Sequence, residues 1–154
     1  MDTICDHLVL DHKRCDHLFA QAENSVSERN WKNADASFRQ FYDALKQHIR
    51  MEEKVLFPAF EQTIRHGDGP IAMLRIEHQQ MRGMVERMHD ALRRFDAVDF
   101  LLHSETFILL MQQHSMKEEV LLYPLLDKAL AGRRDKVIHA MAEYMEINAP
   151  SVSD

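Results

Sequence analysis

Two matching segments of this chain each place a histidine four residues before a pair of glutamates. His48 precedes Glu52 by four residues, and His114 precedes Glu118 by four residues. Residues i and i+4 are neighbours on one face of an α-helix, so each segment would offer an imidazole and a carboxylate to the same point. These two groups together are suitable ligands for iron, manganese or zinc. The chemistry that the spacing predicts is therefore metal binding.

The two segments belong to a longer repeat. A further histidine lies 36 residues before each of them, His12 before His48 and His78 before His114, and the two copies are offset by 66 residues. Neighbouring residues repeat at the same offset: Asp11 and Glu77, Leu56 and Leu122, Pro58 and Pro124. With ten histidines in the chain, one matched pair would mean little. The agreement of the whole set indicates a common site.

The repeat contains six candidate metal ligands. They are His12, His48, Glu52, His78, His114 and Glu118. Burying two carboxylates without a cation costs on the order of several kcal/mol, so a set inside the protein requires a metal. Six ligands exceed what one structural zinc uses, and two related halves suit two metals, with Glu52 and Glu118 as bridging carboxylates. A buried network of His–Glu hydrogen bonds, or residues that face water, is the alternative.

The elements that would position these residues are amphipathic helices. Apolar residues recur every three or four positions, and the four histidines fall on the apolar stripes. The expected helices span about residues 3–27, 33–57, 70–94 and 98–131. Their short or moderate loops predict an all-α, antiparallel up-down-up-down four-helix bundle. Residues 133–147 predict a shorter fifth helix and 149–154 a flexible tail, so 1–148 would form one metal-binding domain.

Prolines predict a break in the second and fourth helices. Pro58 should end or kink the regular helix near Leu56 and Phe57, and Pro124 should repeat the effect. A regular period nevertheless predicts one inward stripe along the whole fourth helix. It comprises Phe100, His103, Phe107, Leu110 or Met111, His114, Glu118, Leu121 and Leu125.

The other reactive side chains have ordinary interpretations. His7 and His17 each lie five residues from His12, about 140° round the helix, and should face solvent. Cys5 and Cys15 are ten residues apart on one expected helix, about 15 Å along its axis, which is too far for a disulfide. Two free thiols fit a reducing cytoplasm.

Composition and charge exclude several classes. A length of 154 residues suits one domain, and four glycines with four prolines leave little room for the turns of an all-β fold. The net charge of -6 argues against a nucleic-acid binder that neutralises phosphates. We find no signal peptide and no apolar run long enough to cross a bilayer, so a cytoplasmic protein without membrane or nucleic-acid partners is expected.

On these residues the chain resembles the hemerythrin-like, or HHE cation-binding, domains. The matching segments are Leu10-Asp11-His12, His48-x-x-x-Glu52-Glu53 with Leu56-Phe57-Pro58, Glu77-His78, and His114-x-x-x-Glu118-Glu119 with Tyr123-Pro124. The resemblance covers residues 1 to about 131. It implies a four-helix bundle around a non-haem centre of two iron ions with an oxo or hydroxo bridge. Such centres bind oxygen, handle nitric oxide or peroxide, sense iron or oxygen, or supply iron.

The chain also departs from the oxygen-carrying hemerythrins. Those proteins have a second histidine four residues after the third-helix one, where this chain has Arg82. Their last carboxylate lies five residues beyond the histidine, where this chain has Glu119. Helix geometry favours Glu118, about 40° from His114 against about 140° for Glu119. Four histidines and two glutamates look more like proteins proposed to repair iron centres, whose N-terminal cysteine-bearing segment is missing here.

Three functions follow as hypotheses. The first is a di-iron protein whose open positions meet oxygen, nitric oxide or peroxide, with zinc or manganese as other possible metals; turnover is not implied. The second is a di-iron oxidase or peroxidase, or an iron-centre repair protein. The third is a helical interaction module that uses methionines and the fifth helix as its surface, although Met81, Met88 and Met111 fall on inward stripes. No residue pattern specifies a protein partner or an oligomeric state.

Overall fold

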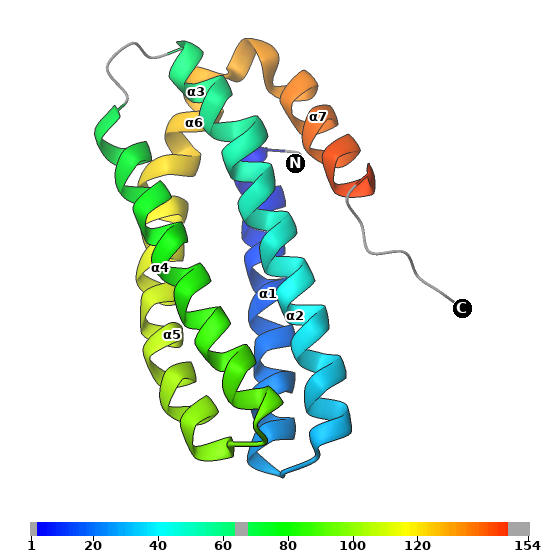
Figure 1. The fold of residues 1–154 in the computed structure, drawn as a ribbon. Coiled ribbons are helices and arrows are strands. Elements are labelled where there is room, and N and C mark those ends of the chain that lie inside the picture. Colours follow the sequence, from blue (N-terminus) through cyan, green and yellow to red (C-terminus); the bar gives the residue numbers. More distant parts are fainter. Residues whose placement is uncertain (1–2, 64–67, 148–154) are drawn as a thin grey trace.

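A computed structural model describes residues 3–63 and 68–147 of the chain. Within these residues every regular element is helical, and four long helices run alternately up and down in a bundle (Figure 1). The elements are α1 (Ile4–Ser27), α2 (Trp31–Met51), η1 (Glu52–Leu56), α3 (Phe57–Thr63), α4 (Asp68–Arg93), α5 (Ala97–Lys117), η2 (Glu118–Leu122), α6 (Tyr123–Ala129), η3 (Ala131–Arg133) and α7 (Arg134–Ile147). The all-α bundle is confirmed.

The repeat of the sequence is also a repeat of the fold. α2 and α5, η1 and η2, and α3 and α6 begin and end 66 residues apart. The preceding loops match too, because Arg29 and Phe95 both have a left-handed φ, of 57° and 55°. The next residues, Asn30 and Asp96, accept a hydrogen bond from the backbone N–H three positions on and cap the helix. The Asn30 cap starts α2 at Trp31, earlier than the expected start near residue 33.

A wide helical turn follows α2 and α5. η1 and η2 are π-helical turns; in η1 the N–H of Phe57 donates to the carbonyl of Glu52, five residues back, and η2 has the equivalent bond. Pro58 and Pro124 follow directly, so the predicted break of the regular helix near residues 56–57 is confirmed. A π turn inserts about one extra residue and thereby changes which side chains face inward after it.

The extra residue overturns the inward stripe expected at the end of the fourth helix. Leu121 and Leu125 are 63% and 46% exposed, whereas Leu122 and Leu126 are buried. The prediction continued the 3.6-residue period through a turn that takes more than four residues. The correction moves each inward position one residue towards the C-terminus.

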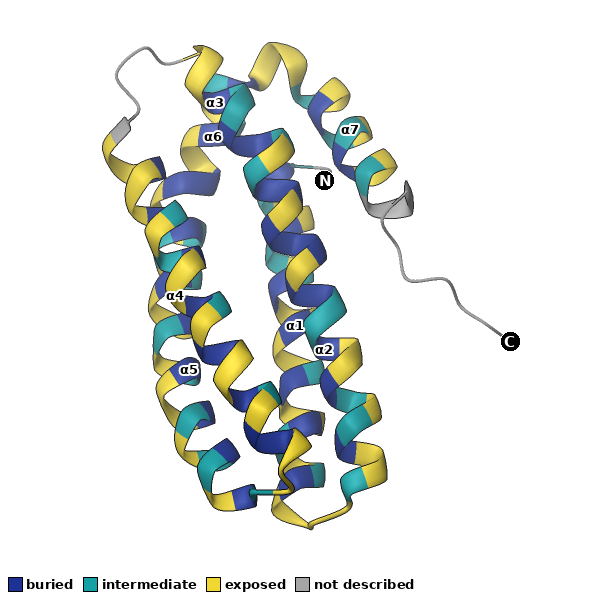
Figure 2. Cartoon of the chain, viewed as in Figure 1, coloured by how far each residue is buried: buried dark blue, intermediate teal, exposed yellow. Residues whose placement is uncertain are grey.

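The four histidines lie between two apolar clusters of the bundle interior. One cluster, near the α1–α2 loop, contains the rings of Phe19, Phe38, Phe41, Phe100 and Phe107. The other is formed by the opposite helix ends with α3, α6 and α7. Along α1, Leu8 belongs to the second cluster, His12 follows, and Cys15 belongs to the first. Packed apolar side chains on both sides therefore hold the polar layer, and Figure 2 shows the buried stripes along the helices.

α7 covers the end of the bundle that carries the second apolar cluster. Val137 and Met141 are buried and pack in that cluster. The predicted fifth helix is confirmed, and it begins at Arg134 after the short 3₁₀ turn η3. Met141 is thus part of the core and not of an adhesive surface. The predicted tail of residues 149–154 lies outside the described residues.

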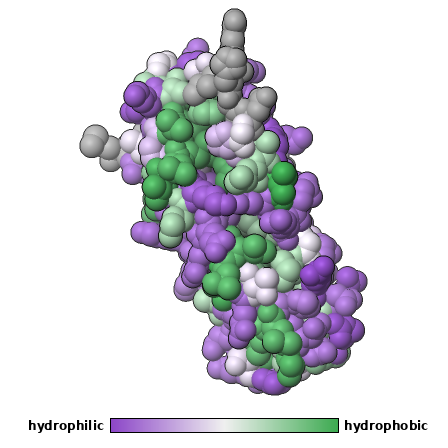
Figure 3. Space-filling model, turned by 90° about the vertical axis from the view of Figure 1, so that its left-hand side faces the viewer, coloured by the Kyte–Doolittle hydropathy of each residue, from purple (hydrophilic) through white to green (hydrophobic). Residues whose placement is uncertain are grey.

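Apolar side chains remain on the outer face of α5. Leu102, Leu109 and Met116 are each more than half exposed and are seven residues apart. On the side of the molecule shown in Figure 3, apolar patches alternate with polar ones along the bundle. None of the described helices combines the length and apolar character that a membrane crossing requires.

Candidate metal centre

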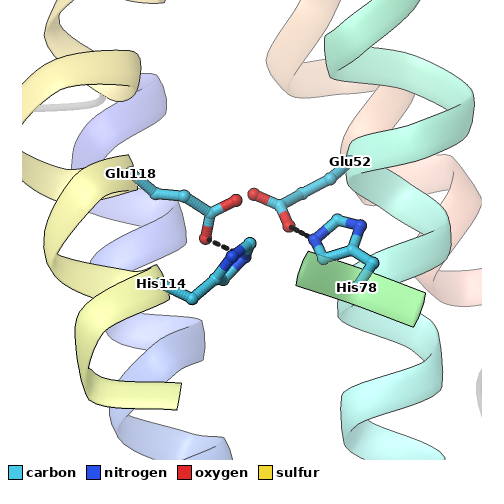
Figure 4. A group of neighbouring side chains, drawn as sticks. All are labelled: Glu52, His78, His114 and Glu118. Atoms are coloured by element: carbon cyan, nitrogen blue, oxygen red, sulfur yellow. Dashed lines mark hydrogen bonds and ion pairs between the residues drawn. The ribbon is translucent and has the colours of Figure 1, made fainter. Parts of the chain in front are cut away.

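All six predicted ligands meet in the polar layer between the two apolar clusters, and we call these six residues the inner cluster. Their exposed fractions are 5% or less. The histidines are on the four long helices, as His12 on α1, His48 on α2, His78 on α4 and His114 on α5, and the glutamates are the first residues of the π turns. Figure 4 shows the carboxylates of Glu52 and Glu118 directed at each other, with His78 and His114 beside them.

Each glutamate reaches a histidine of each half of the repeat. Oε1 of Glu118 lies 3.1 Å from Nε2 of His12 and 3.3 Å from Nε2 of His114. Oε1 of Glu52 lies 3.1 Å from Nε2 of His78 and 3.4 Å from Nε2 of His48. The two carboxylates therefore connect the halves.

The histidines form two pairs. The ring centroids of His12 and His48 are 4.6 Å apart, and those of His78 and His114 are 4.8 Å apart. We call these the His12–His48 pair and the His78–His114 pair. One pair comes from α1 and α2 and the other from α4 and α5, so each pair belongs to one copy of the repeat.

A second group of carboxylates holds the histidines from outside. Each accepts a hydrogen bond from Nδ1 of one imidazole. The pairs are His12 with Glu119 (3.2 Å), His48 with Asp11 (2.7 Å), His78 with Glu53 (2.9 Å) and His114 with Glu77 (2.8 Å). An ionised carboxylate only accepts, so the hydrogen of a neutral imidazole is on Nδ1 and the lone pair of Nε2 faces the centre.

The role of these outer carboxylates was not predicted from the sequence, although a signal was present. Each of them adjoins a predicted ligand in the sequence, as Asp11 adjoins His12 and Glu53 adjoins Glu52. Glu118 lies in the inner cluster, whereas Glu119 reaches the outer side of the His12 ring.

Basic residues pair with three of the four outer carboxylates. The ion pairs are Arg14 with Asp11, Arg82 with Glu53, and Lys117 with Glu77. Among the described residues, no arginine or lysine pairs with Glu119, whose side chain is 32% exposed. Arg82 stands at the position where oxygen-carrying hemerythrins are expected to have a second histidine. Its Nη2 atom lies 2.8 Å from Oε1 of Glu53.

Tyr123 is a further residue at the inner cluster, and no role was predicted for it from the sequence. Its buried hydroxyl lies 2.9 Å from Oε2 of Glu52, 3.0 Å from Oε1 of Glu118 and 3.1 Å from Nε2 of His12. At the equivalent position of the first repeat, the Phe57 ring stacks on one of the histidines instead. The exchange of phenylalanine for tyrosine between two otherwise similar segments was the available signal.

The inner cluster attracts positive charge. Burial opposes ionisation of the Glu52 carboxyl, but the neighbouring His48 and further hydrogen bonds bring its pKa well below the ordinary value. Burial also opposes protonation of the imidazoles. Glu52 and Asp11 nevertheless raise the pKa of His48 well above normal, and hydrogen bonds to Glu52 and Glu53 raise the pKa of His78 to about 9. Without a metal, protons on His48 and His78 would therefore offset part of the carboxylate charge.

Two buried atoms of the cluster lack a hydrogen-bond partner among the described residues. They are Nε2 of His48 and Oε2 of Glu118. An unsatisfied buried polar group costs about 1–3 kcal/mol, and a metal ion would accept the lone pair of either atom. Two sets of side chains have ligand atoms within 4.8 Å of one another: Glu52, His78, His114 and Glu118, and His12, His48 and Glu118. The residues therefore fit a bound cation.

The other reactive residues that the structure describes lie outside the inner cluster. His103 is half-buried and pairs with Asp99 at 3.3 Å, while Ser104 takes the buried position that was expected for the histidine. His17 is exposed, as predicted. Both cysteines are free, and burial raises the pKa of the Cys15 thiol to about 11, which makes it unreactive.

Comparison with known proteins identifies one family. A family model described as the hemerythrin HHE cation binding domain matches residues 3–126. No curated protein and no solved structure matches the chain. The matched segment contains all six predicted ligands, the outer carboxylates and Tyr123.

Proposed function

Because the chain belongs to the hemerythrin HHE cation-binding family, we propose that it holds two iron ions and uses them to bind oxygen, nitric oxide or peroxide. The observation that carries this proposal is the inner cluster, in which four imidazoles and two carboxylates face one another in a buried layer. The ligands that we propose are His12, His48, Glu52, His78, His114 and Glu118.

Each pair of histidines would hold one ion. The rings within the His12–His48 pair and within the His78–His114 pair are closer together than most packed rings of the apolar core. The two inner glutamates would bridge the ions, since each lies within 3.4 Å of one histidine from each pair. Carboxylate bridges between two metals in a four-helix bundle are an established arrangement for di-iron sites.

Iron fits this mixture of nitrogen and oxygen ligands, as do manganese and zinc. When bound, iron supplies a Lewis acid that changes oxidation state and accepts a small molecule as a further ligand. The six side chains divide between two ions, so positions would remain for such a molecule. Zinc would serve a structural role with fewer ligands, which favours iron or manganese here.

The protein itself orients the ligands and controls access. The outer carboxylates hold each Nε2 towards the centre, and the apolar clusters exclude water above and below it. A cavity of about 230 Å³ lies between α1 and α5 and is lined by Asp16, Phe19, Phe107 and Met111, among others. Asp16 and Met111 are each one helical turn from a proposed ligand, so the cavity offers a small molecule an approach to the centre.

The proposal is tested by loading the chain with ferrous iron under anaerobic conditions and recording visible spectra. We expect the spectrum to change on addition of oxygen, nitric oxide or peroxide, and His114→Ala to weaken that change. His139→Ala is the matched control, because this histidine is exposed on α7. The proposal would be overturned by a chain that retains no iron, or by an iron-loaded chain whose visible spectrum changes with none of the three molecules. Sustained consumption of peroxide or oxygen would instead identify an oxidase or peroxidase.

A further inference from the structure

The two repeats differ at one position that touches the inner cluster. Tyr123 follows η2, and Phe57 occupies the equivalent place after η1. The Phe57 ring stacks on His78, with centroids 5.7 Å apart and an interplanar angle of 12°. Tyr123 is equally buried, but its hydroxyl extends into the cluster on the His12 side. One half therefore has an oxygen atom where the other has only an apolar ring.

Hydrogen bonding alone does not satisfy the neighbours of this oxygen. The Tyr123 hydroxyl has one hydrogen, whereas it faces a carboxylate oxygen of Glu52, a carboxylate oxygen of Glu118 and Nε2 of His12. Nδ1 of His12 faces Glu119, and Nε2 of the same ring faces both Glu118 and the Tyr123 hydroxyl. The single hydroxyl hydrogen can be directed at only one of the two carboxylate oxygens, so the other carboxylate contact has no hydroxyl hydrogen to share. A cation among these atoms would relieve the conflict.

The spacing of the four atoms suits a shared ion. The Tyr123 oxygen lies 2.9, 3.0 and 3.1 Å from its three neighbours. Metal bonds to nitrogen and oxygen of about 2.0–2.2 Å separate adjacent ligands of an octahedral ion by roughly 3 Å. The phenol oxygen therefore has the position of a ligand beside three proposed ligand atoms.

We propose that Tyr123 is a seventh metal ligand, which binds the ion of the His12–His48 pair through its phenol oxygen. This inference rests on the proposed function. On binding, the O–H bond breaks, its electron pair forms the metal–oxygen bond, and the proton leaves to solvent. Phe57 supplies no ligand to the His78–His114 pair, so that ion has one protein ligand fewer. The small molecule would therefore bind on the His78–His114 side.

Spectroscopy of the full chain loaded with ferric iron tests this assignment without measuring activity. Tyrosine bound to ferric iron produces a visible charge-transfer band and enhanced ring vibrations in resonance Raman spectra. We expect both signals in the natural chain and their loss in Tyr123→Phe, with iron content retained. Tyr42→Phe is the matched control, because the Tyr42 hydroxyl donates to Glu86, at 2.6 Å, on the exposed side of the bundle. This variant should keep both signals.

Ring-deuterated tyrosine incorporated into the natural chain provides a second measurement that needs no variant. The enhanced vibrations should shift on deuteration, even if Tyr123→Phe proves unable to fold. Iron-loaded natural chain without tyrosine vibrations would reduce Tyr123 to a hydrogen-bonding residue and leave the proposed function intact. Signals that persist in a folded Tyr123→Phe variant would also overturn the assignment. A natural chain that takes up no iron would remove both the proposed function and this inference.

Discussion

The His12 side and the His78 side of the metal centre have equivalent histidines in different electrostatic surroundings. On the His78 side, Oε2 of Glu53 lies 2.9 Å from Nδ1 of His78, and Nη2 of Arg82 lies 2.8 Å from Oε1 of Glu53. On the His12 side, Glu119 holds the imidazole at 3.2 Å. The residue equivalent to Arg82 there is Asp16, 66 residues earlier in the sequence.

Asp16 adds negative charge where its counterpart adds positive charge. Burial raises the pKa of the Asp16 carboxyl; His12 opposes this effect and Glu119 adds to it. The repeat thus preserves the six proposed ligands and the four outer carboxylates, while charged residues beside the outer carboxylates have diverged. We therefore expect the His78 side to hold its ion in a more rigid setting than the His12 side. Tyr123 adds a further difference, because its hydroxyl lies 3.1 Å from Nε2 of His12.

Replacing an inner glutamate should have the largest effect, because it removes what the two sides share. Glu118→Gln keeps the shape of the side chain but removes the charge that reaches both His12 and His114. We expect both ions to be lost, with a decrease in affinity beyond the roughly 10–100-fold typical of outer partners. Metal analysis of the purified variant measures this loss. Glu105→Gln, exposed on α5, is the control, and two ions retained in Glu118→Gln would contradict a bridging role.

Replacing one histidine should affect one side more than the other. His48→Ala removes an imidazole from the His12–His48 pair, and His114→Ala removes one from the His78–His114 pair. Each variant should retain about one ion per chain in place of two, because each keeps one complete pair of histidines. Quantitative metal analysis distinguishes the outcomes. Loss of both ions from either variant would show that the two positions do not bind independently.

Removing the ion pair behind Glu53 should have a smaller effect that is confined to the His78 side. Arg82→Gln leaves Glu53 free to move and loosens its hydrogen bond to His78. Outer partners of metal ligands contribute about 10–100-fold in affinity, and we expect a loss near tenfold because Arg82 acts through Glu53. Competition with a chelator measures the weaker affinity. Arg87→Gln, exposed on the same helix, should bind as the natural chain does; an equal loss in both variants would exclude a specific role for Arg82.

Removing the negative charge near Glu119 should have the smallest effect and the opposite sign. Asp16→Asn relieves repulsion between two partly exposed carboxylates. Interactions of this kind contribute roughly 0.2–1 kcal/mol, so the affinity of the His12 side should rise by a factor of about 1.4 to 5. The same chelator competition at low salt detects the change. A weaker affinity would show that Asp16 supports the His12 side.

The bundle and the grouping of the six inner residues could be predicted because both depend on helical period. His48 and Glu52 occupy neighbouring places on one helix face whatever the helix packs against. The exposure of Leu121 and Leu125 could not be predicted, because a π turn changes the helical period and no residue type in that segment is specific to such a turn. The partners of the outer carboxylates depend on packing between helices. Asp11 is next to His12 in the sequence but accepts a hydrogen bond from His48 of α2. The direction of the Tyr123 side chain depends both on the π turn and on packing between helices.

The requirement of the inner cluster for cations is tested most directly by titrating metal-free chain with ferrous iron under anaerobic conditions and measuring the iron bound at equilibrium. We predict saturation at two ions per chain, with release of protons from the imidazoles as the metal replaces them. A folded chain that binds no iron would contradict the assignment of this buried layer as a metal centre.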